Sequence, residues 1–235
     1  LQARPVGWAA VYDEDFFLDR DRAVEFLNLW GESPLAQRYR LNLQTNPCSL
    51  LRQGMPDVAI FELIDRVKPM VQLGGESFHP AMLARWRKRH SAPQLEAVLD
   101  ALEATRQDYT VFQILTDYES TIDELRENVR LLCSAAKRFA RMRIASTPYM
   151  IPLKDTEIWQ RLTYGGRALS VDASFCPELP IPRINHFTDH ETPQPDWMDR
   201  RVADLADRVD EQLQWALYPE RRQAAIETVE KLVRQ

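Results

Sequence analysis

The residues best suited to chemistry follow a short apolar run in the first third of the chain. Residues 70–73 form this run and suit a buried strand. Gly74 and Gly75 follow, and because glycine has no Cβ, a ligand can approach the backbone closely there. Glu76 and Ser77 come next, past the predicted strand end where ligands bind in folds of parallel strands. The same residues also fit an ordinary strand-to-helix turn, in which Gly and Ser serve geometry and capping.

Polar residues also follow the other predicted strands. They are Asp13-Glu14-Asp15, Gln44-Thr45, Thr116-Asp117-Tyr118-Glu119 and Thr147-Pro148-Tyr149. A ligand-binding mouth requires polar groups at successive strand ends, although such residues are common at any strand end. Three adjacent carboxylates repel one another, so a buried site at residues 13–15 would need a cationic partner. Without one, we expect at least two of these acids to point to solvent and one to cap the helix at residue 19.

Strands and helices alternate around these residues. Short runs of apolar or alternating residues predict strands over 6–12, 39–43, 70–73, 109–115 and 142–146. Helices are predicted over 19–30, from Pro56, from Pro80, over 93–105 after the cap Ser91, from Thr121 to about 140 and over 155–162. Thr121 opens a capping box with Glu124. The alternation is typical of parallel strands joined by right-handed crossovers, in either a barrel or a doubly wound sheet.

Two further segments stand out. The helix predicted from Pro80 carries a basic run on its outer face, Arg85, Arg87, Lys88 and Arg89, which we interpret as solvated surface, with a phosphate or partner site as the alternative. Near the C-terminus an apolar stripe at steps of three or four predicts helices interrupted at Pro219. The stripe comprises Val202, Leu205, Val209, Leu213 and Leu217, and the last helix continues it with Ile226, Val229, Leu232 and Val233.

Composition narrows the class of protein. The 235 residues are 45% hydrophobic, enough for one large domain or two small ones. The formal net charge is -5, and without a basic excess we expect no binding to nucleic acid. No apolar run is long enough for a membrane helix, and no signal peptide is visible. Cys48, Cys133 and Cys176 are far apart, which indicates free thiols in a reducing compartment, and we expect a cytoplasmic protein.

Taken in order, four motifs resemble those of the radical S-adenosylmethionine superfamily, most of all the branch that often carries a cobalamin-binding domain. They are residues 12–16, residues 74–77, Glu119-Ser120-Thr121 after the strand that ends near Thr116, and Thr147-Pro148-Tyr149 followed by Asp155-Thr156-Glu157. The resemblance implies strands two to six of a six-stranded, partial TIM-like (β/α) barrel. The domains expected are this barrel over 1–162, a proline-rich irregular connection over 163–194 and a C-terminal helical extension over 195–235.

The resemblance also implies cofactors and site residues. The cofactors are S-adenosylmethionine and a 4Fe–4S cluster, with cobalamin as a further candidate. Glu14 matches the acid that binds the ammonium group of S-adenosylmethionine, a bond stronger than one between neutral groups. Glu76 and Ser77 match positions that face the same cofactor. The whole set expected to bind S-adenosylmethionine is Glu14, Gln44, Gly74, Gly75, Glu76, Ser77 and Thr116.

The sequence departs from the family in three places. The Cys-x3-Cys-x2-Cys motif that binds the cluster is absent, Asp117-Tyr118 alters the fifth-strand motif, and residues 151–154 alter the sixth. One expectation, favoured by the start at Leu1, is the C-terminal portion of an enzyme that cleaves S-adenosylmethionine reductively and starts radical chemistry on an unknown small-molecule or peptide substrate. Its cluster would lie in a missing N-terminal segment or on a partner chain. The alternative is a degenerate, non-catalytic barrel that acts as a binding or scaffold subunit.

A metal-dependent hydrolase is a third alternative. The segment from His186 to Glu191 groups two histidines with two acids, and histidines four residues apart on a helix can bind zinc or iron. Pro182 and Pro193 flank the segment, which does not look helical. We therefore favour solvated or hydrogen-bonded histidines there and assign no metal ligand.

Overall fold

A computed structural model gives the structure of this chain and describes residues 7–150 and 199–234. Several predictions fall outside these ranges: the helix over 155–162 with the motif at 155–157, the connection over 163–194, the free thiol of Cys176 and the histidine segment at 186–191.

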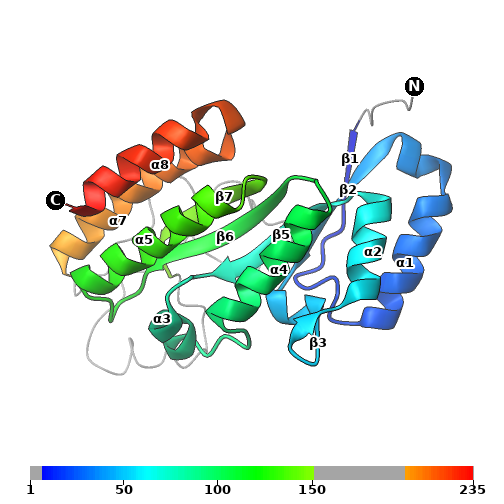
Figure 1. Cartoon of the computed structure of the whole chain (residues 1–235), viewed down its shortest axis with the longest axis horizontal. Helices are drawn as coiled ribbons and strands as arrows, with labels where there is room; N and C mark the ends of the chain where they lie inside the picture. The colour runs from blue at the N-terminus through cyan, green and yellow to red at the C-terminus, as the bar shows by residue number, and fades with distance from the viewer. Residues whose placement is uncertain (1–6, 151–198, 235) are drawn as a thin grey trace, which may run out of the picture.

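Five parallel strands form the central sheet, in the order β1-β2-β5-β6-β7 (Figure 1). They are β1 (Gly7–Ala10), β2 (Tyr39–Thr45), β5 (Met70–Glu76), β6 (Tyr109–Thr116) and β7 (Met142–Tyr149). Each strand neighbours the next strand of this sheet along the chain, so the strand order never reverses. A doubly wound sheet has such a reversal. The structure is therefore a curled half-barrel, as the resemblance implied.

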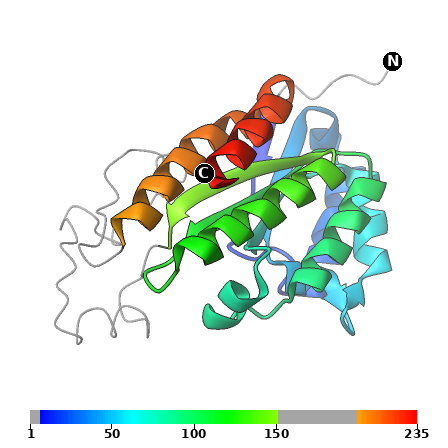
Figure 2. The same cartoon turned by 60° about the vertical axis from the view of Figure 1, so that its left-hand side comes forward.

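Helices connect the strands and lie on one face of the sheet (Figures 1 and 2). They are α1 (Arg20–Glu32), α2 (Val58–Val67), α4 (Ala92–Ala104) and α5 (Ile122–Arg138). The short helix α3 (Pro80–Arg85) lies beyond the carboxyl end of β5. Helices α7 (Arg200–Leu213) and α8 (Pro219–Arg234), joined by a 3-10 turn at Gln214–Leu217, form the predicted extension beside β7 and α5. None of these helices is long and apolar enough to cross a membrane.

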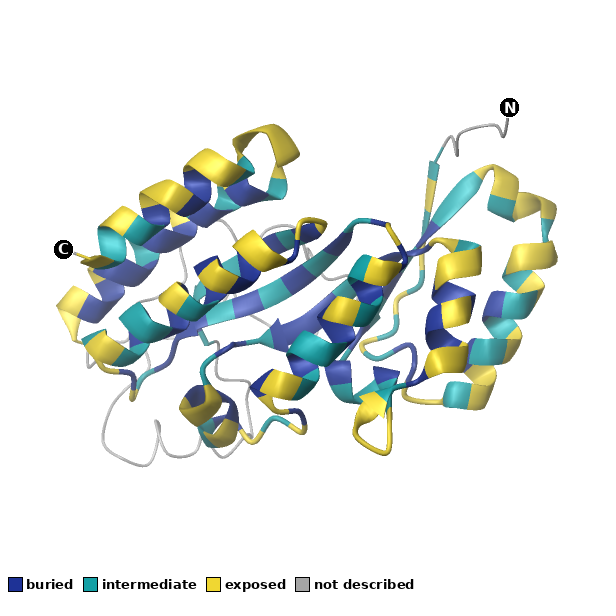
Figure 3. Ribbon diagram, viewed as in Figure 1, coloured by how far each residue is buried: buried dark blue, intermediate teal, exposed yellow. Residues whose placement is uncertain are grey.

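The two faces of the sheet differ in burial (Figure 3). In β2, Leu41 and Leu43 are buried, whereas Asn42 and Gln44 between them are half-buried. The register pairs Gln44 with Gln72 of β5, so the half-buried amides of the two strands are neighbours. Because successive side chains of a strand point to opposite faces, the helices cover the leucine face and the amides lie on the concave face.

The helix starts predicted at Pro80, Ser91 and Thr121 are confirmed, whereas the one predicted at Pro56 is wrong. Ser91 and Thr121 both cap their helices, each within a capping box. Pro56, in contrast, does not start α2. It belongs to β4 (Met55–Pro56), which pairs antiparallel with β3 (Leu51–Arg52) in a small hairpin that the sequence analysis missed. Asp57 is the true cap of α2, and its side chain accepts hydrogen bonds from two N–H groups of the first turn.

Candidate functional site

Glu76 ends β5 in a strained turn. Its φ is 61°, in the left-handed region that residues other than glycine rarely adopt. The Ser77 N–H donates to the Gly75 carbonyl at 2.7 Å, which closes a three-residue turn around Glu76. Turns of this kind with positive φ are rare and strained. Such strain persists only where the surrounding structure holds it, and it gathers at ligand sites.

The two glycines before Glu76 have different surroundings. A Cβ on Gly75 would lie 2.6 Å from Cγ1 of Val111, so packing against β6 requires glycine there. A Cβ on Gly74 would lie 3.1 Å from both Oδ1 of Asn46 and Oε1 of Glu76. The missing Cβ of Gly74 therefore leaves a small cradle between two oxygen acceptors at the end of β5.

Lys88 is the ion-pair partner of Glu76. Its Nζ lies 3.3 Å from Oε1 of Glu76, and the two side chains are 32% and 19% exposed. The chain reaches Lys88 through a Schellman motif at the end of α3. In this motif the N–H groups of Arg87 and Lys88 donate to the carbonyls of Ala84 and Leu83, and Arg87 has a φ of 53°. The backbone therefore fixes the point from which Lys88 extends towards Glu76.

His90 closes the loop that contains α3. Its side chain is buried, and Nε2 donates to the Gly75 carbonyl at 3.2 Å. Burial lowers the pKa of His90, so the ring is neutral at physiological pH. The same carbonyl accepts the Ser77 N–H, so both ends of the segment 76–90 are fixed at one atom.

Ser77 is buried and hydrogen-bonded within the protein. Its hydroxyl donates to Oδ1 of Asn128 at 2.7 Å and accepts the His79 N–H at 2.9 Å. These bonds anchor the start of the loop on α5. Binding of a ligand by Ser77 stays a prediction.

Asp15 joins the segment after β1 to the end of β2. Its carboxylate accepts hydrogen bonds from the Thr45 hydroxyl at 2.6 Å, the Asn46 side-chain amide at 3.0 Å and the Ser49 hydroxyl at 2.7 Å. These neutral donors take the place of the cationic partner that a buried acid was expected to need. Asp15 therefore shapes the strand ends and is not itself free to bind a ligand.

The expectation for the three adjacent acids is wrong in detail. Only Glu14 among them is exposed, and no described residue is its hydrogen-bond or ion-pair partner. Asp13 forms an ion pair with Arg22 at 2.5 Å, and this hydrogen bond lowers the pKa of Asp13. Asp19, not one of the three, caps α1 through the Arg22 N–H. Glu14 is thus the exposed acid of the three, and the ligand-binding role that the resemblance implied for it stays a prediction.

The other two predicted site residues lie at neighbouring strands. Gln44 is half-buried on the concave face beside Gln72. Thr116 is buried at the end of β6, and its hydroxyl donates to the Asp117 carbonyl at 3.2 Å. The structure therefore brings Gln44, Glu76 and Thr116 to the carboxyl ends of β2, β5 and β6, while Glu14 follows β1. Their binding of S-adenosylmethionine stays a prediction.

Arg85 is not solvated surface, contrary to the interpretation of the basic run. Its Nε donates to Asp117 at 2.8 Å and its Nη1 to Glu124 at 2.9 Å. Asp117 is only 1% exposed and also accepts the indole N–H of Trp86. This buried ion pair holds α3 against the segment after β6. Periodicity cannot reveal a partner that lies 32 residues away in sequence.

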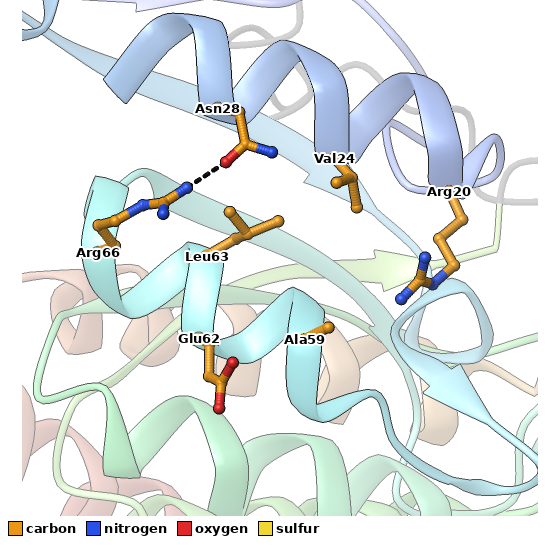
Figure 4. A pocket seen from close by; sticks show the side chains of 7 residues that line it. All are labelled: Arg20, Val24, Asn28, Ala59, Glu62, Leu63 and Arg66. Atoms are coloured by element: carbon orange, nitrogen blue, oxygen red, sulfur yellow. Dashed lines mark hydrogen bonds between the residues drawn. The ribbon is translucent and has the colours of Figure 1, made fainter. Parts of the chain in front are cut away.

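Two grooves open on the surface near the segment after β1. One, of about 260 Å³, lies between α1 and α2, where Arg66 donates to Oδ1 of Asn28 (Figure 4). The other, of about 540 Å³, lies beyond the carboxyl ends of β1 and β2. Its lining comprises Phe17, Leu18, Arg20, Asp21, Cys48, Ser49, Leu51, Arg52, Asp57 and Arg89.

The described residues do not fit a 4Fe–4S cluster, which requires cysteine thiolates. Within 7–150 and 199–234, no three His, Cys, Asp or Glu side chains are grouped so as to hold a metal ion. Cys48 is half-buried after β2, and Cys133 is buried in α5, where burial raises its pKa to about 12. The described strand ends do present two carboxylates, Glu14 and Glu76, and their binding of S-adenosylmethionine stays a prediction.

No family model and no curated protein matches this sequence. Among solved structures, the radical S-adenosylmethionine methyltransferase TsrM from Kitasatospora setae, with cobalamin and a [4Fe-4S] cluster bound, matches with a TM-score of 0.59 and 12% identity. The match covers 97% of this chain and 52% of TsrM. The cobalamin-dependent S-adenosylmethionine radical enzyme OxsB, with aqua-cobalamin bound, matches with a TM-score of 0.48 and 16% identity, over 68% of this chain and 23% of OxsB.

This chain thus spans about half the length of TsrM and about a quarter of that of OxsB. At such low identities the similarity shows the fold alone. The predicted fold, part of a radical S-adenosylmethionine (β/α) barrel with a C-terminal helical extension, is confirmed by the match to TsrM.

Proposed function

We propose that this chain provides the S-adenosylmethionine-binding part of a radical S-adenosylmethionine enzyme. The observation that carries the proposal is the strained turn at Glu76, which holds a carboxylate beside the Gly74 cradle at the carboxyl end of β5. This turn lies in a half-barrel whose fold is similar to that of a radical S-adenosylmethionine methyltransferase. Ligands of (β/α) barrels bind at this end of the strands.

The proposed work of this chain is to bind and orient the ligand. Glu76 and the exposed Glu14 attract its ammonium group through charge-assisted hydrogen bonds. The absence of a Cβ at Gly74 lets the ligand approach the backbone. The amides of Gln44 and Gln72 offer both donors and acceptors to its hydroxyl or adenine groups from the concave face.

The reaction that we propose for the assembled enzyme is reductive cleavage of S-adenosylmethionine, which starts radical chemistry on a small-molecule or peptide substrate. A 4Fe–4S cluster would supply the electron, with its ligands on a further segment or a partner chain, since the described residues do not hold it. TsrM was solved with cobalamin bound, which supports cobalamin as a further cofactor of the assembled enzyme.

A non-catalytic binding subunit is the second candidate. The observation in its favour is that the described residues include no group of cluster ligands. Under this alternative the same site at the carboxyl ends of the strands binds an adenosyl ligand, but the ligand is not cleaved.

Binding of S-adenosylhomocysteine to the purified chain, detected by saturation-transfer difference NMR, tests the proposal. We expect saturation of the adenine and methionine-derived protons with the wild type and a clear loss with Glu76→Gln or Glu14→Gln. Glu62→Gln is the matched control, because Glu62 is exposed on the groove between α1 and α2 (Figure 4). Absence of any saturation transfer with the wild type would contradict the proposal.

A second measurement separates the two candidate functions. The enzyme, assembled with its cluster-bearing segment or partner, should release 5′-deoxyadenosine when S-adenosylmethionine and a reductant are added without oxygen. Ligand binding without this product would favour the non-catalytic subunit.

A further inference from the structure

We infer that the groove beyond the carboxyl ends of β1 and β2 is a second binding site, which takes a ligand with an anionic group, carboxylate or phosphate, on an apolar body. This inference goes beyond the proposed function and does not depend on it. The described lining of the groove includes none of the residues expected to bind S-adenosylmethionine. The volume of the groove, about 540 Å³, suits a small organic molecule.

Two arginines of the lining are available to an anion. Arg52 and Arg89 are both exposed, and neither has a hydrogen-bond or ion-pair partner among the described residues. A guanidinium group presents its N–H donors in a planar fork that matches the oxygen atoms of a carboxylate or a phosphate. Two such groups on one groove therefore favour an anionic ligand.

The fold brings these two arginines together from distant parts of the sequence. Arg52 belongs to the hairpin of β3 and β4, in which it pairs with Met55. Arg89 belongs to the basic run after α3, and the next residue, His90, is buried and bonded to the Gly75 carbonyl. The backbone at both positions is thus held by paired or buried neighbours.

A third arginine of the lining is oriented by a buried acid. Arg20 donates to the Asp57 carboxylate through Nε at 2.7 Å and through Nη2 at 3.4 Å, and Asp57 is only 5% exposed. The remaining nitrogen, Nη1, lies 3.8 Å from Asp21, which is too far for a hydrogen bond. Asp57 therefore fixes the Arg20 guanidinium at the groove and leaves its Nη1 donors for a ligand.

The two acids of the lining do not cancel this positive charge. Asp57 is already neutralised, because its carboxylate accepts hydrogen bonds from Arg20 and from the N–H groups of Ala59 and Ile60. The side chain of Asp21 is 99% exposed, so solvent screens its charge. The charges of Arg52 and Arg89 thus remain uncompensated, although the whole chain has a net charge of -5.

The groove also offers apolar surface beside these charges. Leu18 is 70% exposed, and Phe17 and Leu51 contribute further apolar side chains to the lining. Burial of such surface against a ligand is favourable, and it adds to the attraction between the arginines and an anion. A ligand that combines an apolar body with an anionic group matches both parts of the lining.

Titrations of three probes by saturation-transfer difference NMR test the inference on the purified chain. Phenylacetate carries a carboxylate, phenyl phosphate carries a phosphate, and phenylacetamide has the same ring without a charge. We expect both anions to bind at least about tenfold more tightly than phenylacetamide, because only the anions gain charge-assisted hydrogen bonds. Tighter binding of either anion over the other fits the inference and identifies the preferred group.

Arginine variants place this binding in the groove. Arg52→Gln and Arg89→Gln should each weaken both anions about threefold or more, the double variant about tenfold or more, and phenylacetamide should be unaffected. Both side chains are exposed, so these variants should fold like the wild type. Arg106→Gln is the matched control, since Arg106 is an exposed arginine before the amino end of β6.

A leucine variant tests the apolar part of the groove. Leu18→Ser should weaken all three probes, because the ring of each loses apolar contact. Leu29→Ser, which removes an exposed leucine near the far end of α1, should weaken none of them.

Three results would overturn the inference. They are no binding of either anion by the wild type, equal affinities for phenylacetate and phenylacetamide, and unchanged affinities for the anions in the double arginine variant. The proposed function would stand in each case, because its own test measures binding of S-adenosylhomocysteine at other residues.

Discussion

The hydroxyl of Ser77 donates a 2.7 Å hydrogen bond to Oδ1 of Asn128, and both residues are buried. The other end of the Asn128 amide donates to the carbonyls of Ile114 and Leu115 at 3.2 and 3.0 Å. One side chain of α5 therefore ties the end of β5 to the end of β6. The position of Glu76 depends on this tie, because Glu76 directly precedes Ser77.

Asn128→Ala should destabilise the protein by about 2 kcal/mol, since it leaves buried hydrogen-bonding groups of Ser77 and β6 without partners. Urea unfolding followed by circular dichroism measures the change. Asn28→Ala is the control, because the side-chain partner of Asn28 within the described residues is the exposed Arg66 in the groove of Figure 4, and this change should alter stability by about 0.5 kcal/mol or less. Equal losses for the two variants would show that Asn128 has no special part in joining the strands.

The two glycines of β5 should respond differently to alanine. Gly75→Ala places a Cβ 2.6 Å from Val111 and should destabilise the fold by about 1–3 kcal/mol. Gly74→Ala meets only side-chain atoms at 3.1 Å, so the fold should persist while binding of S-adenosylhomocysteine falls. Thermal unfolding and ligand titration of both variants test this. Addition of Val111→Ala should restore part of the stability of Gly75→Ala, and its failure to do so would refute the steric explanation.

Asp210 should make stability depend on pH. It is buried between α7 and β7, where it accepts hydrogen bonds from Ser146 and Gln214, and burial raises its pKa from 3.8 to about 6. The folded protein thus binds this proton more tightly than the unfolded chain does. The stability that Asp210 contributes is fully present below pH 3.8 and is lost as the pH rises through about 6. The loss at neutral pH is about 3 kcal/mol.

Asp210→Asn should therefore be more stable than the wild type at pH 7.5, and this advantage should shrink towards pH 4. Urea unfolding of both proteins across this range measures the contribution of Asp210 alone. Carboxylates with a lowered pKa, such as Asp57, are present in both proteins, so their pH dependence cancels in the difference. Asp204→Asn is the control, since Asp204 is exposed on the same helix. An advantage that did not vary with pH would rule out Asp210 as its source.

Removal of Arg85 should leave an uncompensated charge in the interior. Arg85→Met strands the Asp117 carboxylate, which is 1% exposed, and should cost about 3 kcal/mol. The double variant Arg85→Met/Asp117→Asn should be more stable than Arg85→Met alone, because the stranded charge is gone. Unfolding free energies of the two single variants and the double variant give the coupling. Arg138→Met, which breaks exposed ion pairs, should cost less than about 1 kcal/mol.

Apolar runs and capping motifs predicted the strands and helices well, because these elements depend mainly on residues that are close together in the sequence. The apolar runs of β5 and β6 and the capping boxes at Ser91 and Thr121 are specified by neighbours in the sequence, and the structure confirms them. Pro56 misled because proline suits the first turn of a helix and also the edge of a small hairpin. The signal that could have corrected it is Asp57, a strong N-cap residue that comes next in the sequence.

The site was less predictable, because its geometry depends on contacts between distant segments. The sequence placed Glu76 at a strand end but could not show its positive φ. In the structure this φ occurs together with the hydrogen bonds from Ser77 and His90 to the Gly75 carbonyl. It also could not show that Lys88 forms an ion pair with Glu76 while Arg85 forms one with Asp117. A run of basic residues in a sequence shows that the segment is charged, but it does not show which of these residues form ion pairs in the fold.

The Gly75 carbonyl accepts hydrogen bonds from both Ser77 and His90, so the segment between them forms a closed loop. The two ends of the segment are fastened at one atom, although Gly75 and His90 are 15 positions apart. Extra residues inserted near Arg87 would therefore lengthen the loop without disturbing the pairing of β5 with β6.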